Sequence, residues 1–176
     1  MKKLLGFFAA IGLIALMFIS LNATAYYVAY FHDVPPDHAF YSEIEYVRTH
    51  GIAMGYLDGS FHPNETVTRA QFVAMAVKAR GASPSESTYL RCYTDVFSDW
   101  YANEVCYAKS LGWIPNTTYF SPDTAIVADN ARTIMQSAFG VTPQVTLSNS
   151  VTRAQAAALM YAVRGTGGSQ PLSYNS

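Results

Sequence analysis

The sequence of 176 residues predicts an all-α fold of repeated helix–loop–helix units, for three reasons. The pattern aromatic-x-Asp-Val occurs at 31–34 and again at 93–96. Apolar residues at helical spacing follow each copy. The tetrapeptide Thr-Arg-Ala-Gln occurs at 68–71 and again at 152–155. Because such short helices are unstable alone, we expect the units to pack as one pseudo-symmetric helical bundle.

The first unit, residues 31–81, begins with a short amphipathic helix. Ile44 and Val47 lie at helical spacing, and Gly51 is expected to end the helix. Turn-forming residues then fill 55–64, which predicts a loop between the two helices of the unit.

The second helix of this unit is expected to run from Thr68 to Arg80. Thr68 and Gln71 have the spacing of a capping box, in which the hydroxyl accepts from the third amide of the helix and the Gln side chain reaches back to the N–H of the capping residue. The repeated motif at 152–155 predicts another helix, which extends to about Arg164.

The third unit is represented only by its second half. The predicted segments are a signal peptide (1–25), a first unit (31–81), a linker (82–92), a degenerate second unit (93–140), a partial third unit (141–165) and a flexible tail (166–176). This chain alone is therefore not expected to form three complete units. A partner chain could complete the bundle as a homo-oligomer.

The N-terminal residues have the three parts of a secretory signal peptide. Lys2 and Lys3 precede an uncharged run over 4–21, and Ala23 and Ala25 form a small-x-small cleavage site. Cleavage after Ala25 would leave a secreted protein with no membrane contact. The alternative is an uncleaved membrane anchor, because about eighteen uncharged residues is the lower limit for a bilayer span.

Two cysteines, Cys92 and Cys106, lie in the part that would be exported. In an oxidising compartment they are expected to form one disulfide, and two unpaired buried thiols are the alternative. The four histidines do not cluster with the cysteines, so no metal site is expected.

The charge composition argues against a nucleic-acid partner. Eleven Lys and Arg against twelve Asp and Glu give a net charge of −1, so no basic surface is expected to neutralise phosphates. The motifs Gly-x-Ser-x-Gly, His-Glu-x-x-His and the phosphate-binding loop do not occur in the sequence. We therefore expect neither enzymatic activity nor a cofactor.

Four segments of the chain resemble the S-layer homology modules of bacterial cell surfaces. They are Phe31-x-Asp33-Val34, Gly51-Ile52, Gly55-Tyr-Leu-Asp-Gly59-x-Phe61-x-Pro63 and Val67-Thr-Arg-Ala-Gln71. The resemblance implies non-covalent anchoring to the cell wall through secondary wall polysaccharides, which often carry ketal-linked pyruvate. It also implies a pseudo-threefold assembly of three modules, with glycan bound in the grooves between adjacent modules.

Arg69 and Arg153 are candidate ligand-binding residues. The helix dipole disfavours a cation in the first turn, so helix stability does not explain their position. Free amides at a helix start, together with a guanidinium group, would bind a carboxylate of the glycan. The alternative is that Arg69 pairs with Asp33, Asp58 or Glu65 and only ties the loop to the helix.

Asp33 and Asp95 precede the first helix of their units, where a capping or turn-forming role is the simplest interpretation. The resemblance implies instead that they line a groove with Trp100, which would stack on a sugar. Burial in the core is the alternative for Trp100. Tyr56 is a further candidate contact, and Gly59 allows positive φ or close approach of the ligand.

The second unit departs from the family pattern. Ala128 stands where the first unit has Arg69, so that groove has lost its cation, and one or two working grooves are expected. The expected function is binding of cell-wall polysaccharide at the cell surface. The alternative is an interaction protein that binds another surface protein or assembles with itself.

Overall fold

The computed structural model describes residues 30–85 and 91–165. Its helices are α1 (Tyr41–Thr49), α2 (Arg69–Ala79), α3 (Ala102–Ser110), α4 (Ala128–Phe139) and α5 (Arg153–Gly165). Within the described ranges, extended backbone pairs only as isolated bridges and no strand forms. The predicted all-α fold class is thus confirmed. The predicted signal peptide (1–25) and tail (166–176) lie outside the described residues.

Capping boxes begin α2 and α5. The Gln71 backbone N–H donates to Oγ1 of Thr68 (3.2 Å), and the Thr68 N–H donates to Oε1 of Gln71 (2.9 Å). Thr152 and Gln155 form the same reciprocal pair, at 3.3 and 3.0 Å. Each helix therefore begins one residue after its threonine, as the motif predicts.

Helix α1 also follows its sequence pattern. α1 buries Ile44 and Val47, the two residues that the helical spacing places on one face. It ends at Thr49, and Gly51 follows with φ of +65°, a conformation that glycine adopts without strain.

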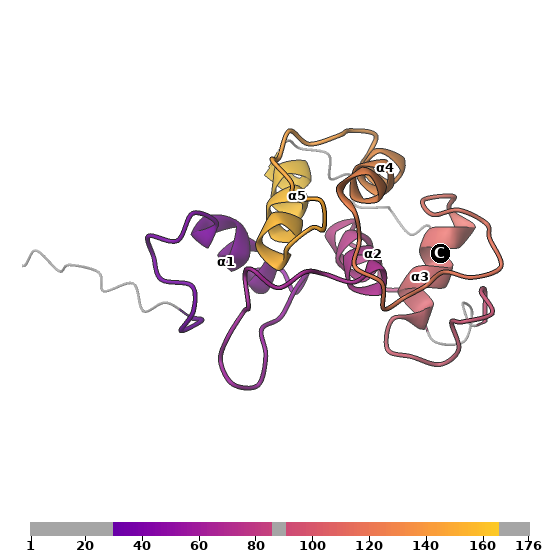
Figure 1. Cartoon of the computed structure of the whole chain (residues 1–176), viewed down its shortest axis with the longest axis horizontal. Coiled ribbons are helices and arrows are strands. Elements are labelled where there is room, and N and C mark those ends of the chain that lie inside the picture. Colours follow the sequence, from indigo (N-terminus) through magenta and orange to yellow (C-terminus); the bar gives the residue numbers. More distant parts are fainter. Residues whose placement is uncertain (1–29, 86–90, 166–176) are drawn as a thin grey trace, which may run out of the picture.

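The central helix of the fold is α2. It packs against α3, α4 and α5, while α1 packs against α5 at one end of the molecule (Figure 1). Eight of its eleven residues are buried, so apolar or small residues cover nearly the whole helix. Such all-round burial is expected of a helix that has neighbours on several sides.

The three segments that directly precede α2, α4 and α5 in the sequence meet in space. The Val67 N–H donates to the Val151 carbonyl (2.9 Å), the Val151 N–H to the Ile126 carbonyl (3.0 Å), and the Ile126 N–H to the Val67 carbonyl (3.0 Å). All three side chains are fully buried. This closed ring of hydrogen bonds brings the starts of the three helices to one point in the core.

Residues 141–150 replace a first helix in the third unit. This segment connects α4 to α5 (Figure 1) and is fastened to α4 by Arg132, whose Nη2 donates to the Val145 carbonyl (3.1 Å). Val145 and Leu147 pack against the core. The exposed residues of α4 are Asp129, Asn130, Thr133, Gln136 and Ser137. The outer face of α4 is thus polar and suited to water.

Cys92 and Cys106 form the expected disulfide, with their Cα atoms 5.4 Å apart. The bond ties the segment before the second unit to α3. Lys109 supports the same place, because its Nζ donates to the Cys92 carbonyl and lies 3.9 Å from the centre of the Tyr93 ring.

Candidate functional site

A pocket of about 200 Å³ lies between α2, the loop that follows α1, and the start of α5. Its lining residues are Ile52, Ala53, Met54, Gly55, Tyr56, Gln71, Ala74, Met75, Lys78, Trp100 and Arg153. Three of the predicted glycan-binding residues, Tyr56, Trp100 and Arg153, come together here. They belong to the first, second and third predicted units respectively.

Arg153 is held firmly in the wall of this pocket. Only 7% of the residue is exposed, its Nε donates to the Phe61 carbonyl (2.7 Å), and its Nη2 donates to the Met54 carbonyl (3.1 Å). The guanidinium carbon lies 4.8 Å from the centre of the Tyr56 ring and 4.6 Å from that of Phe61. Nη1 makes no hydrogen bond within the described residues, so it remains a donor for a ligand.

Trp100 presents a free aromatic surface at the edge of the pocket. It is 65% exposed, so the alternative of core burial is wrong. The next residue, Tyr101, is buried and meets the indole edge-on, with ring centres 5.4 Å apart. Burial, followed by the charge and hydrogen bond of Asp99, raises the pKa of Tyr101 to about 12. The buried tyrosine thus anchors the backbone beside an exposed stacking face.

The pocket is positively charged, although the chain as a whole is not. Lys78 and Arg153 line it, and no Asp or Glu does. The nearby Glu65 accepts a hydrogen bond from the Tyr56 hydroxyl (3.0 Å) and lies outside the lining. Two cations, an exposed indole and several apolar side chains suit an anion that also carries a flat, weakly polar face.

The helix starts themselves are not available to an anion, contrary to expectation. The first two N–H groups of α2 donate to the carbonyls of Thr124 and Pro122 (2.9 and 3.1 Å), and the third donates to the Thr68 hydroxyl. The first two N–H groups of α5 likewise donate to Glu65 and Pro63 (2.8 and 3.0 Å). Loop carbonyls have therefore taken the place that an anion would occupy.

Arg69 lies outside the pocket. Its Nε donates to the Phe120 carbonyl (2.8 Å), and its guanidinium carbon lies 4.9 Å from the centre of the Phe120 ring. Arg69 thus clamps the loop of the second unit in the way that Arg153 clamps the loop of the first. The alternative of an ion pair with Asp33, Asp58 or Glu65 is wrong, since none forms in the described part of the chain.

Asp33 and Asp95 hold the loops of their own units. Asp33 accepts hydrogen bonds from the N–H groups of Phe61 (2.8 Å) and His62 (2.7 Å). Asp95 accepts them from Phe120 (2.8 Å) and Ser121 (2.7 Å). Partial burial raises the pKa of each carboxyl, but these hydrogen bonds lower it more, so both pKa values lie below the usual range. Turn formation is therefore the role that the geometry gives them, and neither lines the pocket.

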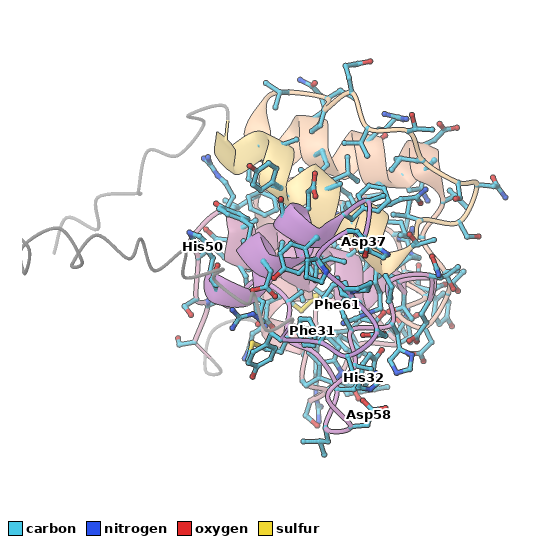
Figure 2. All side chains as sticks on the ribbon, turned by 90° about the vertical axis from the view of Figure 1, so that its left-hand side faces the viewer. Phe31, His32, Asp37, His50, Asp58 and Phe61 are labelled. Atoms are coloured by element: carbon cyan, nitrogen blue, oxygen red, sulfur yellow. A yellow bond between two sulfur atoms is a disulfide. The ribbon has the colours of Figure 1, made fainter. Side chains whose placement is uncertain are left out.

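Two glycines shape the loop of the first unit. Gly59 has φ of +83° and lies outside the pocket lining. At Gly55, which does line the pocket, an added Cβ would lie 2.1 Å from Cε1 of Phe31. Figure 2 shows Phe31 close to Phe61, with His32 and Asp58 further out at the tip of this loop.

Sequence reasoning missed Gln71 and Lys78 as pocket residues. Together with Ala74 and Met75 they line one side of the pocket at positions i, i+3, i+4 and i+7 of α2. This spacing marks a single helix face. A polar residue at each end of such a face was the signal that could have identified them.

A second, more open pocket of about 400 Å³ lies beside the disulfide. It is lined by Arg91, Cys92, Tyr93, Thr94, Phe97, Thr117 and Thr118. None of the predicted glycan-binding residues is among them, and all come from the end of the predicted linker and the second unit. The pocket beside α2 is the better candidate because it gathers the predicted residues and two cations.

The described residues thus form a small all-α domain with a cationic, aromatic pocket where segments of three units meet. Residues 30–73 match the model of the S-layer homology domain, so the resemblance is confirmed for this part of the chain.

Relatives of known name carry similar segments. The chain is 30% identical over 115 residues to a surface layer protein of Brevibacillus choshinensis, covering 62% of this chain and 10% of that protein. It is 32% identical over 101 residues to a middle cell wall protein of Brevibacillus brevis (54% and 10%). An amylopullulanase of Thermoanaerobacterium thermosulfurigenes is 36% identical over 104 residues (54% and 5%). The chain therefore spans a tenth or less of each relative.

No helix in the ranges 30–85 and 91–165 is long and apolar enough to cross a membrane.

Proposed function

We propose that this protein attaches to the bacterial cell wall by binding a secondary wall polysaccharide in the pocket beside α2, without catalysing a reaction. The observation that carries the proposal is the meeting of Tyr56, Trp100 and Arg153 in one pocket lined by two cations and no acid. The match to the S-layer homology domain supports it.

An anionic glycan, such as one that carries a pyruvate ketal, fits this chemistry. Its carboxylate would accept hydrogen bonds from Nη1 of Arg153 and interact with the ammonium group of Lys78. The sugar ring would stack on Trp100, because an indole offers a wide face and is 65% exposed here.

The remaining predicted residues would have a structural role. Arg69, Asp33 and Asp95 hold the loops through backbone hydrogen bonds. Gly59 supplies a turn with positive φ. We propose that they support the pocket without touching the glycan.

We further propose that the units are arranged with pseudo-threefold symmetry and that one groove works. The ring of hydrogen bonds through Val67, Ile126 and Val151 supports the symmetry. Ala128 stands at the start of α4, where α2 and α5 have an arginine, so no guanidinium group is available for a groove there. The polysaccharide would then be bound at one site per chain.

A co-sedimentation experiment tests the proposed function. The protein is mixed with purified wall sacculi, before and after chemical removal of the secondary polysaccharides. We expect it to sediment with the untreated sacculi only. Equal binding to stripped sacculi would contradict the proposal, and binding to a surface protein alone would favour the interaction-protein alternative.

A further inference from the structure

The two cysteines of the disulfide differ in their surroundings. Cys92 is partly exposed and lines the pocket of about 400 Å³ in the second unit. Cys106 is only 3% exposed and does not line that pocket. The rate of thiol–disulfide exchange depends on which sulfur an incoming thiolate can reach. The structure therefore favours attack on Cys92 over attack on Cys106.

Two cations lie next to Cys92. Arg91 lines the same pocket and makes no hydrogen bond or ion pair within the ranges 30–85 and 91–165. Lys109 lies in α3, three residues after Cys106, and its Nζ donates to the Cys92 carbonyl. No Asp or Glu is among the lining residues. Positive charge at such a place stabilises both an incoming thiolate and a thiolate that leaves.

The rest of the pocket suits a small polar molecule. Thr94, Thr117 and Thr118 contribute hydroxyl groups, and Phe97 contributes an apolar ring that is 57% exposed. The Thr94 N–H donates to the Thr118 carbonyl (3.0 Å), which fixes two sides of the pocket relative to each other. About 400 Å³ has room for a low-molecular-weight thiol and not for a folded protein. Arg91 would bind the carboxylate of such a thiol.

We propose that Cys92 is an exchange site for a small thiol that carries a carboxylate, which becomes bound in this pocket as a mixed disulfide. The thiolate of the small molecule attacks Sγ of Cys92 and forms a new S–S bond. The bond between Cys92 and Cys106 breaks, and its electron pair stays on Cys106, which leaves as a thiolate and takes up a proton from water. The step consumes one thiolate, needs no oxidant and releases the segment before the second unit from α3.

The test compares two small thiols of opposite charge, 3-mercaptopropionate and cysteamine. Opening of the disulfide is followed by acid quenching, alkylation and mass spectrometry. Each rate is divided by the rate at which the same thiolate opens bis(2-hydroxyethyl) disulfide, because the two thiolates differ in nucleophilicity. We expect 3-mercaptopropionate to be faster by about threefold or more on this scale. Peptide mapping should find the small thiol on Cys92.

Two variants test the role of the pocket cation. Arg91→Asn removes it, and asparagine tolerates the positive φ (+56°) of this position. Arg48→Asn makes the same change of charge on α1, outside the pocket, and is the matched control. We expect Arg91→Asn to lose the preference for 3-mercaptopropionate and Arg48→Asn to keep it. An Arg91→Asn protein with the parent's preference would overturn the inference.

Urea separates attack on the folded protein from attack after unfolding. The parent's rate should change less than about twofold in 1 M urea, whereas opening through global unfolding would become about fivefold faster or more. Such an acceleration, or a mixed disulfide on Cys106, would overturn the inference. Neither result bears on the proposed function, because the two pockets share no lining residue.

Discussion

At the scale of single residues, Arg153 has a structural role and a proposed binding role. Two of its donors hold loop carbonyls, and the residue also lines the pocket beside α2. Arg69 makes the equivalent clamp at Phe120 but lies outside the pocket. The same sequence motif thus lies in two different surroundings, because only one of the two clamps lines a pocket with Trp100 and Lys78.

We predict that Arg153→Ala lowers the free energy of unfolding by about 3 kcal/mol, since the carbonyls of Phe61 and Met54 lose a charged donor. Lys78→Met is the matched change of charge on an exposed side chain and should alter stability by less than about 0.5 kcal/mol. Urea unfolding measures both. Equal stability of Arg153→Ala and the parent would contradict the clamp, whereas weaker binding to purified wall polysaccharide is expected of both variants.

The hydrogen bonds of Asp33 and Asp95 to the loops predict that the stability of the protein depends on pH. The pKa values of Asp33 and Asp95 are lowered in the folded protein, so their contribution is present above the unfolded-state value of about 3.9 and is lost as pH falls through the folded value. The parent should therefore lose stability below about pH 4.

The double variant Asp33→Asn/Asp95→Asn tests this assignment, because it removes both titrating groups while leaving an acceptor oxygen. It should be less stable than the parent at pH 7 and should lose less stability between pH 5 and pH 2. Asp37→Asn, which changes an exposed carboxylate with no hydrogen bond in the described residues, is the control. The same acid dependence in the parent and in the double variant would show that other groups carry the effect.

At the scale of elements, the helices were predictable and the pocket was not. The capping boxes at Thr68 and Thr152 and the glycine after α1 are local signals, so they located the helix ends within about two residues. The pocket depends on contacts between residues as far apart as Met54 and Arg153, whose placement depends on how the helices pack. The carbonyls that fill the helix starts also come from distant loops, which is why the expectation of free amides failed.

The segment 141–150, which takes the place of a first helix in the third unit, bears on the oligomeric state. A partner chain would be needed if α4 exposed an apolar face, but its exposed residues are polar and 141–150 packs beside it. We therefore expect the protein without residues 1–25 to be a monomer at micromolar concentration by analytical ultracentrifugation. A stable dimer would contradict this prediction and favour completion of the bundle by a second copy.

At the scale of the whole molecule, repeats in the sequence predicted that the units share one core, but not how the chain closes on itself. The closure is seen in the backbone ring through Val67, Ile126 and Val151, and in the packing of α1 against α5. Apolar periodicity marks which face of a helix is buried and does not specify its neighbour. The reduced third unit contributes the start of α5, and with it Arg153, to the pocket.

The central claim is that the pocket beside α2 binds the wall polysaccharide, and the exposed aromatic residues of the second unit test it most directly. Trp100 lines this pocket, whereas Phe97, 57% exposed three residues earlier, lines the pocket beside the disulfide. Both can be changed to alanine without opening the core. We predict that Trp100→Ala weakens binding to purified wall polysaccharide about tenfold and that Phe97→Ala binds like the parent. Unchanged binding by Trp100→Ala, or loss of binding by Phe97→Ala alone, would contradict the claim.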